Sequence, residues 1–243
     1  MNNIYKIMKR NLKFIHHQRS IFLSNIRELV FGAQDGMVST LGALTGIAIG
    51  SNNHFFVILS GFVIVAVEAT SMGIGSYLST KSVMDVNKRK LEEEKSELKK
   101  DTGREIEELI ILYVKEGWSL ALAKEMALEA SKKKNLFLQE MAYRELGIKK
   151  ELEKPLRSGI FMFFSYIVGG FIPVLSYLVF PISSAIFFSI GITLFSLFLL
   201  GCIIARFTRQ KLWKAGLRMF LIAGIAVVVG LVVGNTVSFL FPG

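Results

Sequence analysis

Asp35 is the single charged residue of the apolar, glycine-rich run LVFGAQDGMVSTLGALTGIAIG at residues 29–50. A carboxylate at such a position normally faces a bundle interior or a water-filled cavity, where it marks a route for ions. Glu68 and Met72 stand in the next apolar run, four residues apart and so on one face of a helix. Alternatively, Glu68 is a protonated carboxyl hydrogen-bonded within the bundle, and Met72 is packing against core or lipid. Taken together, the three side chains predict a route for a cation.

Helix geometry predicts that Asp35 and Met72 lie at one depth. At about 1.5 Å per residue, Asp35 lies roughly 12 Å beyond Arg27, and Met72 lies roughly 13 Å before Lys81. An antiparallel pair of helices therefore brings the carboxylate and the thioether to the same level, with Glu68 about one turn further from the basic flanks.

Small residues surround Asp35 at helical spacing. They permit close approach of helix backbones, and packing alone is the simpler interpretation of them. We expect them to lie on similar faces of one helix: Gly32, Gly36, Gly42, Gly46 and Gly50.

A second group of acidic residues is concentrated between residues 85 and 153, and it contains pairs at the i, i+3 spacing of one helix face. Carboxylates bind hard cations, and a thioether adds a preference for transition metals. The alternative is a solvated charged face, since lysines are mixed with the acids. The candidate ligands are Glu94 and Glu97, Glu105 and Glu108, Glu145, and Met141 one turn before Glu145.

The inventory of residues excludes several classes of protein. With 52% hydrophobic residues and a mean hydropathy of +0.49, the chain is too apolar for an ordinary soluble domain. Cys202 is the only cysteine, which excludes an internal disulfide and a cysteine zinc site. No Glu-x-x-His pair and no P-loop motif occurs, so neither a di-iron centre nor a P-loop ATPase is predicted. We expect no prosthetic group, and any transport must use an ion gradient, the membrane potential or a partner.

Five apolar stretches are long enough to cross a bilayer, which takes roughly 20 helical residues. The fold class is therefore predicted as an all-α integral membrane protein with five transmembrane helices. Their expected ranges are 29–50, 55–79, 158–180, 183–205 and 218–241. The chain is then divided into a basic N-terminal arm at 1–28, helices one and two at 29–80, a helical insert at 81–157, and helices three to five at 158–243.

The basic residues predict the orientation in the membrane. All 29 Lys and Arg residues lie in the arm, in the insert, or from the loop after the fourth helix to the first residue of the fifth, Arg218. Because basic loops stay in the cytoplasm, the N-terminus and insert are predicted to be cytoplasmic and the C-terminus outside or luminal. This topology accounts for the net charge of +10 without a nucleic-acid partner. The short chain shows no vacuolar targeting signal and no cleavable signal peptide, and it suits a prokaryotic plasma membrane.

The insert is predicted to contain three amphipathic helices. Ser119 is expected to cap the second of them and Asn135 the third, which Gly147 ends. Because no helix-breaking residue separates Tyr77 from Glu97, the first helix is expected to continue directly from the second span.

The sequence resembles the vacuolar iron transporter family over about residues 25–237. The segments FGAQDGMVSTLGALTG, SMGIGSYLSTKS, MAYRELG and YIVGGFIPVLSY carry the resemblance in that order. It implies a homodimer whose first two helices line a pathway between protomers. It also implies movement of Fe²⁺, and often Mn²⁺, out of the cytosol in exchange for protons.

The resemblance assigns roles to single residues. The pathway aspartate and methionine of the family fall on Asp35 and Met72, and Ile64 stands where the family often has a glutamate, one turn before Glu68. Ala142 stands where the family often has a second methionine. The metal-binding residues of the insert fall on Glu94, Glu97, Glu105, Glu108, Glu145 and Met141.

The resulting hypothesis is a proton-coupled exporter of divalent transition metal. Fe²⁺ is the expected substrate, with Mn²⁺ and Zn²⁺ as further candidates, and membrane lipid, protons and a second copy of the chain are the expected partners. One alternative is a membrane-anchored metal sensor or chaperone that transports nothing. Another is a membrane scaffold whose basic faces hold anionic lipid or partner proteins.

Overall fold

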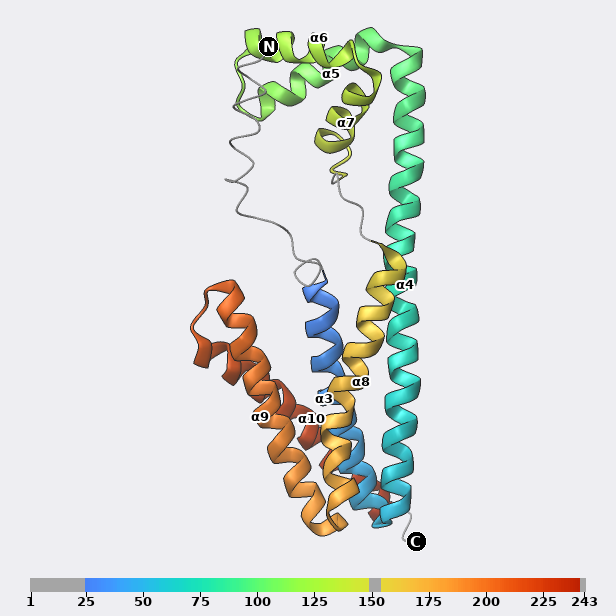
Figure 1. Cartoon of the computed structure of the whole chain (residues 1–243), viewed down its shortest axis with the longest axis vertical. Helices are drawn as coiled ribbons and strands as arrows, with labels where there is room; N and C mark the ends of the chain where they lie inside the picture. The colour runs from blue at the N-terminus through green and yellow to red at the C-terminus, as the bar shows by residue number, and fades with distance from the viewer. Residues whose placement is uncertain (1–24, 149–153, 241–243) are drawn as a thin grey trace, which may run out of the picture. The chain divides into compact units, whose positions relative to one another are not determined.

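The protein is described by a computed structural model that covers residues 25–148 and 154–240 (Figure 1). Most of the expected N-terminal arm therefore lies outside the described residues. Within them, all regular structure is α-helical, which confirms the all-α part of the predicted fold class. The helices are α3 (Ile26–Ser51), α4 (His54–Lys100), α5 (Thr102–Lys115), α6 (Leu120–Ser131), α7 (Lys134–Arg144), α8 (Pro155–Val179), α9 (Ile182–Thr208) and α10 (Leu212–Leu240).

Four of the described helices are long and apolar enough to cross a membrane, namely α4, α8, α9 and α10. The first expected span corresponds to α3, which does not meet the same criterion, because Gln34, Asp35 and a series of Gly, Ser and Thr residues lower its hydropathy. This helix packs extensively against α10 and also against α9 and α8. A helix enclosed by its neighbours needs fewer apolar residues than a helix that faces lipid.

The chain divides into two compact units. Unit 1 contains Met1–Ser76 and Ser158–Gly243, and unit 2 contains Tyr77–Arg157. Helix α4 runs without interruption from one unit into the other, because no Gly or Pro occurs between Tyr77 and Lys100. The expectation that the second span continues into the insert is confirmed.

The glycines of α3 pack against two different helices. A Cβ on Gly32 or Gly36 would collide with Ser165 or with the backbone of Tyr166 on α8. Gly42, Gly46 and Gly50 instead face Ala226, Gly230 and Gly234 of α10, where a Cβ on Gly46 would lie 3.0 Å from the Gly230 carbonyl. The expectation of one similar face was wrong, because the six residues from Gly36 to Gly42 turn the helix by about 240°.

Substitution at the α3–α10 contact tests this packing. Gly230→Ala is expected to destabilise unit 1 by about 1–3 kcal/mol, because its methyl group would collide with the Gly42 carbonyl. Gly224→Ala on the same helix is the matched control, since nothing lies within 4 Å of a Cβ there. Thermal unfolding of the purified protein in detergent measures the difference, and equal melting temperatures for the two variants would contradict the close crossing.

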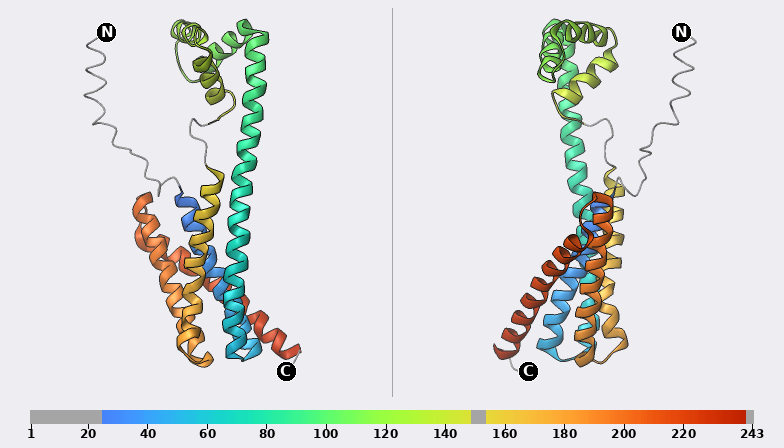
Figure 2. Two further views of the ribbon diagram at one scale, coloured as in Figure 1. Left: turned by 45° about the vertical axis from the view of Figure 1, so that its right-hand side comes forward. Right: turned by 90° about the vertical axis from the view of Figure 1, so that its left-hand side faces the viewer.

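In unit 2, helices α5, α6 and α7 gather at the C-terminal end of α4 (Figure 2). They enclose an apolar cluster that includes Leu109, Tyr113 and Phe137. The Ser119 side chain accepts a hydrogen bond from the Leu122 N–H at 3.4 Å, so the predicted cap of α6 is confirmed.

The predicted start and end of α7 need correction. The cap of α7 is Lys133, which has an extended backbone, and Asn135 lies inside the first turn. The helix ends at Arg144, before Gly147, whose φ of +64° belongs to the left-handed region that glycine favours.

Candidate functional site

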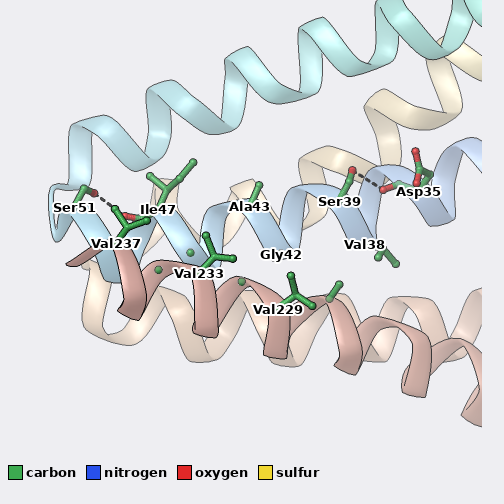
Figure 3. A pocket seen from close by; sticks show the side chains of 15 residues that line it. Asp35, Val38, Ser39, Gly42, Ala43, Ile47, Ser51, Val229, Val233 and Val237 are labelled. Atoms are coloured by element: carbon green, nitrogen blue, oxygen red, sulfur yellow. Dashed lines mark hydrogen bonds between the residues drawn. The ribbon is translucent and has the colours of Figure 1, made fainter. Parts of the chain in front are cut away.

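Asp35 lies on α3 at one end of an elongated cavity of ≈ 770 Å³ between α3 and α10 (Figure 3). Valines and glycines make up most of the lining, and Asp35 is the only ionisable residue in it within residues 25–148 and 154–240. The cavity continues along α3 to Ser51, the last residue of the helix. A single half-buried carboxylate thus faces an apolar groove that follows the helix axis.

The helix register places Asp35 between the two other predicted pathway residues. Thr40 of α3 and Val65 of α4 border the same residue of α8. Counting five residues along each antiparallel helix from that pair brings Asp35 level with position 70, so Glu68 and Met72 each lie about 3 Å away along the axis. The expected pairing of Asp35 with Met72 alone is thus shifted by about half a turn, because packing sets the register.

Asp35 and Glu68 form what we call the acid pair. Glu68 is the charged group that acts most on Asp35. Glu68 is exposed on the surface of unit 1, whereas Asp35 and Met72 are half-buried. The two carboxylates therefore lie at or near the surface of unit 1 on which Glu68 is exposed, where a cation could reach both.

Tyr166 of α8 is a functional candidate that the sequence reasoning did not identify. It is fully buried, and both members of the acid pair act on it electrostatically. The Ser39 hydroxyl donates to the Asp35 carbonyl at 2.7 Å, so the 2.6 Å hydrogen bond between Ser39 and Tyr166 has the phenol as its donor. A signal for Tyr166 existed in the segment YIVGGFIPVLSY, where Tyr166, Gly170, Pro173 and Tyr177 recur on one helix face.

A second candidate site lies wholly within unit 2. The carboxylates of Glu94, Glu105 and Glu145 each place an oxygen within 4.8 Å of the others. Glu94 and Glu105 are only 2% and 6% exposed, and Glu94 Oε1 has no hydrogen-bond partner. We call these three residues the acid cluster. Its oxygens could hold a divalent ion.

Local sequence explains why these three side chains converge. Asp101 alone separates α4 from α5, and its side chain accepts a hydrogen bond from the Arg104 N–H at 3.1 Å, which caps α5. The sharp turn brings Glu105, in the first turn of α5, back beside Glu94. Glu145 is the C-terminal cap residue of α7, and its N–H donates to the Met141 carbonyl at 2.8 Å.

Burial and mutual repulsion make the acid cluster a strong binder of protons. Burial, followed by the charges of Glu145 and Glu105, raises the pKa of Glu94 to about 8. The pKa of Glu105 is raised by burial and then by Glu108, and that of Glu145 is raised by burial and then by Glu108. A divalent cation would remove this repulsion and release the protons.

The other predicted ligands of the insert occupy different surroundings. Glu97 and Glu108 act on the cluster as neighbouring charges, but neither belongs to the group of oxygens within 4.8 Å. Met141 is fully buried in the apolar cluster of unit 2 together with Leu109 and Phe137. The structure thus gives Met141 a packing role, and ligation through its sulfur stays a prediction.

Residues 26–235 match the sequence model of the VIT family. The chain is 28% identical over 215 residues to vacuolar iron transporter 1 of Arabidopsis thaliana, a match that covers 87% of this chain and 86% of that protein. It is 30% identical over 206 residues to a vacuolar iron transporter of Centaurea cyanus, covering 83% of each, and 28% identical over 229 residues to one of Plasmodium falciparum, covering 88% and 84%.

The family match spans both units, and it includes the acid pair, Met72 and the acid cluster. The relatives match over more than four-fifths of their own lengths, so the similarity is not confined to one unit. The chain therefore belongs to the VIT family, the family of vacuolar iron transporters.

Proposed function

We propose that the protein carries divalent transition-metal ions, Fe²⁺ first among them, out of the cytosol in exchange for protons. The observation that carries the proposal is the acid pair beside Met72, set among helices of membrane-spanning length, with Asp35 lining one end of the α3–α10 cavity. Carboxylate and thioether together favour a transition metal over Mg²⁺ or Ca²⁺. The names of the relatives support iron as the substrate, and Mn²⁺ and Zn²⁺ are further candidates.

We infer five membrane spans, with α3 as the first, although its composition alone does not qualify it. Residues 29–80 and 158–243 form the membrane part, and 81–157 form the insert. The distribution of Lys and Arg supports a cytoplasmic arm and insert and a C-terminus on the opposite side. A prokaryotic plasma membrane is the proposed location.

A homodimer is proposed because the acid pair adjoins an uncovered surface of unit 1. Glu68 is exposed there on a membrane-spanning part of α4. A carboxylate that faces lipid is unfavourable by several kcal/mol, so a second copy is expected to cover this surface and enclose a polar path.

The proposed mechanism uses competition between metal and proton at the same oxygens. The acid cluster collects cytosolic metal, with Glu97 and Glu108 attracting it. The ion then passes to Asp35, Met72 and Glu68. A proton that binds a carboxylate removes the ligand and releases the ion, so proton entry and metal exit are linked. The metal is the substrate in this scheme, and no prosthetic group takes part.

The role of Met72 is tested by its effect on selectivity. Met72→Leu keeps the side-chain volume but removes the sulfur, so Mg²⁺ is expected to compete with Fe²⁺ uptake several-fold better than in the wild type. Met84→Leu on the same helix is the control, because Met84 lies about three turns away. Uptake of radioactive Fe²⁺ into proteoliposomes is measured with increasing Mg²⁺ outside. Identical inhibition curves for both variants would rule out ligation by the thioether.

A metal sensor or chaperone is the second candidate, and the acid cluster within a compact unit of its own favours it. Such a protein would bind Fe²⁺ without moving it. The decisive measurement is the accumulation of Fe²⁺ inside sealed vesicles that contain the purified protein. Accumulation above that of empty vesicles supports the transporter, and binding without accumulation supports the sensor.

A further inference from the structure

One face of α8 carries two phenols into the interior of unit 1. Tyr166, Gly170, Pro173 and Tyr177 recur at intervals of three and four residues, and all four are buried. Tyr166 is 0% exposed and Tyr177 is 1% exposed. Tyr177 stands eleven positions after Tyr166, which is about 16 Å along the helix, roughly half of a bilayer's hydrocarbon thickness.

Hydroxyl groups from α3 and α9 border the same face. Ser39 bonds to Tyr166 at 2.6 Å, and Thr40 Oγ1 would lie 3.1 Å from a Cβ on Gly170. Ser189 of α9 donates to the Pro173 carbonyl at 3.0 Å. These contacts place a hydroxyl near each successive turn of α8 from Tyr166 toward its C-terminal end.

Pro173 adds a polar group to this region. A proline inside a helix has no N–H, so the carbonyl of Gly169 four residues earlier loses its helical partner. Between membrane helices such a group needs another partner, because an unsatisfied carbonyl in a bilayer is unfavourable by several kcal/mol.

Three buried hydroxyls here have no well-formed hydrogen bond within the described structure, namely Thr40 Oγ1, Thr193 Oγ1 and the Tyr177 hydroxyl. Two of them still have a hydroxyl neighbour that acts on them, since Thr40 interacts with Tyr166 and Tyr177 with Ser189. Helical Ser and Thr residues can bond to the carbonyl four residues earlier, as Thr45 does to Leu41 at 2.7 Å. Hydroxyls that forgo this bond while fully buried are typical partners of internal water.

The same row approaches the acid pair at one end. Both acidic groups act on Tyr166. At the other end, Ser189 acts on Tyr177, which lies two residues before the end of α8. Thr193 lies one turn from Ser189 on α9, between the two ends. The row contains neither a carboxylate nor a thioether.

We propose that Tyr166, Thr40, Thr193, Ser189 and Tyr177 line a hydrated proton route through unit 1, separate from the path of the metal along the α3–α10 cavity. We call them the hydroxyl row. Each hydroxyl or water accepts a proton on its oxygen while its own proton passes to the next, so no group keeps a charge and nothing is oxidised. The link to metal transport rests on the proposed function, whereas the hydration does not.

Hydration is tested without transport, by X-ray hydroxyl-radical footprinting of the full chain in nanodiscs. Radicals formed from bound water are expected to oxidise Tyr177 in the wild type, and oxidation is expected to fall several-fold in Thr193→Val/Ser189→Ala. Tyr113, which is 2% exposed in unit 2, is the internal standard. Oxidation of wild-type Tyr177 at the background level, or oxidation unchanged in the variant, would overturn the proposal.

Coupling is tested with isosteric variants in proteoliposomes, where metal uptake and luminal pH are recorded together. Thr193→Val with Tyr177→Phe is expected to lower the maximal rate of proton-coupled uptake several-fold while the half-saturating Fe²⁺ concentration stays unchanged. Thr236→Val is the matched control, because the Thr236 hydroxyl bonds to its own helix at Val232, at 2.8 Å. An unchanged rate in the double variant, or a loss of affinity equal to the loss of rate, would refute the separate route. Wild-type vesicles that take up no metal would instead refute the proposed function.

Discussion

Asp35→Asn is expected to lower the initial rate of Fe²⁺ uptake into proteoliposomes by about 100-fold, which corresponds to about 2.7 kcal/mol. The amide keeps the shape of the side chain and one oxygen ligand, but it removes the negative charge. Among the described residues, Asp35 is the only ionisable one that lines the α3–α10 cavity, so none of the other described lining groups can replace that charge. The amide also cannot exchange a metal ion for a proton, so coupling is lost along with affinity.

The control for this variant is Asp85→Asn. Asp85 is exposed on α4, where it pairs with Lys81 at 3.4 Å, and an exposed pair of this kind contributes little. We expect uptake within about twofold of the wild type for the control. Both variants should elute as folded protein in size-exclusion chromatography. Rapid Fe²⁺ uptake by folded Asp35→Asn would remove Asp35 from the pathway.

Glu94→Gln is expected to change how the stability of unit 2 depends on pH and to remove most of the metal binding by this unit. Burial raises the pKa of Glu94 to about 8 from a usual value of 4.5. Between these two values the folded unit keeps a proton that the unfolded chain has lost, so the free energy of unfolding falls as pH rises through that window. Glutamine cannot lose a proton. The free energy of unfolding of the variant should therefore decline less as the pH rises. Above about pH 8 the variant should be more stable than the metal-free wild type.

The chain offers a clean optical readout for this comparison. It has two tryptophans, and Trp213→Phe leaves Trp118, between α5 and α6, as the reporter of unit 2. Urea unfolding is followed by its fluorescence at a series of pH values. A steeper loss of stability with pH in Glu94→Gln than in the wild type would contradict the assigned cause of the pKa shift.

The same unfolding measurement can detect metal binding to the acid cluster. Zn²⁺ is a suitable probe because it does not change oxidation state. It should raise the free energy of unfolding of the wild type more at pH 8 than at pH 6, because protons compete for the same oxygens. Most of this gain should disappear in Glu94→Gln and persist in Glu125→Gln, an exposed change on α6. An equal gain in both variants would show that the metal binds elsewhere.

The helices were predictable because their signals are local. The lengths of the apolar stretches predicted four of the spans, and the absence of Gly and Pro between Tyr77 and Lys100 predicted that α4 is continuous. The enclosure of α3 depends on contacts with α8 and α10, and a hydropathy count cannot register those contacts. The start of α7 was missed for a similar reason, since the backbone of Lys133 turns into the helix without help from a side-chain cap.

The sites were predictable in composition but not in arrangement. The carboxylates at helical spacing pointed to Glu94 and Glu105, yet only the turn at Asp101 shows that they meet across two helices. Tyr166 comes from α8, more than a hundred residues from Asp35 in the chain, so its approach to the acid pair depends on tertiary packing alone. Met141 shows the converse, because a position that suggested a ligand lies in an apolar core.

The most direct test of proton-coupled metal export is the simultaneous recording of Fe²⁺ uptake and luminal pH in wild-type proteoliposomes with the insert facing outward. Proton-coupled export predicts that an acidic lumen accelerates Fe²⁺ entry and that the luminal pH rises as the metal enters. Fe²⁺ entry at the same rate with and without a pH gradient, and with no change in luminal pH, would contradict it.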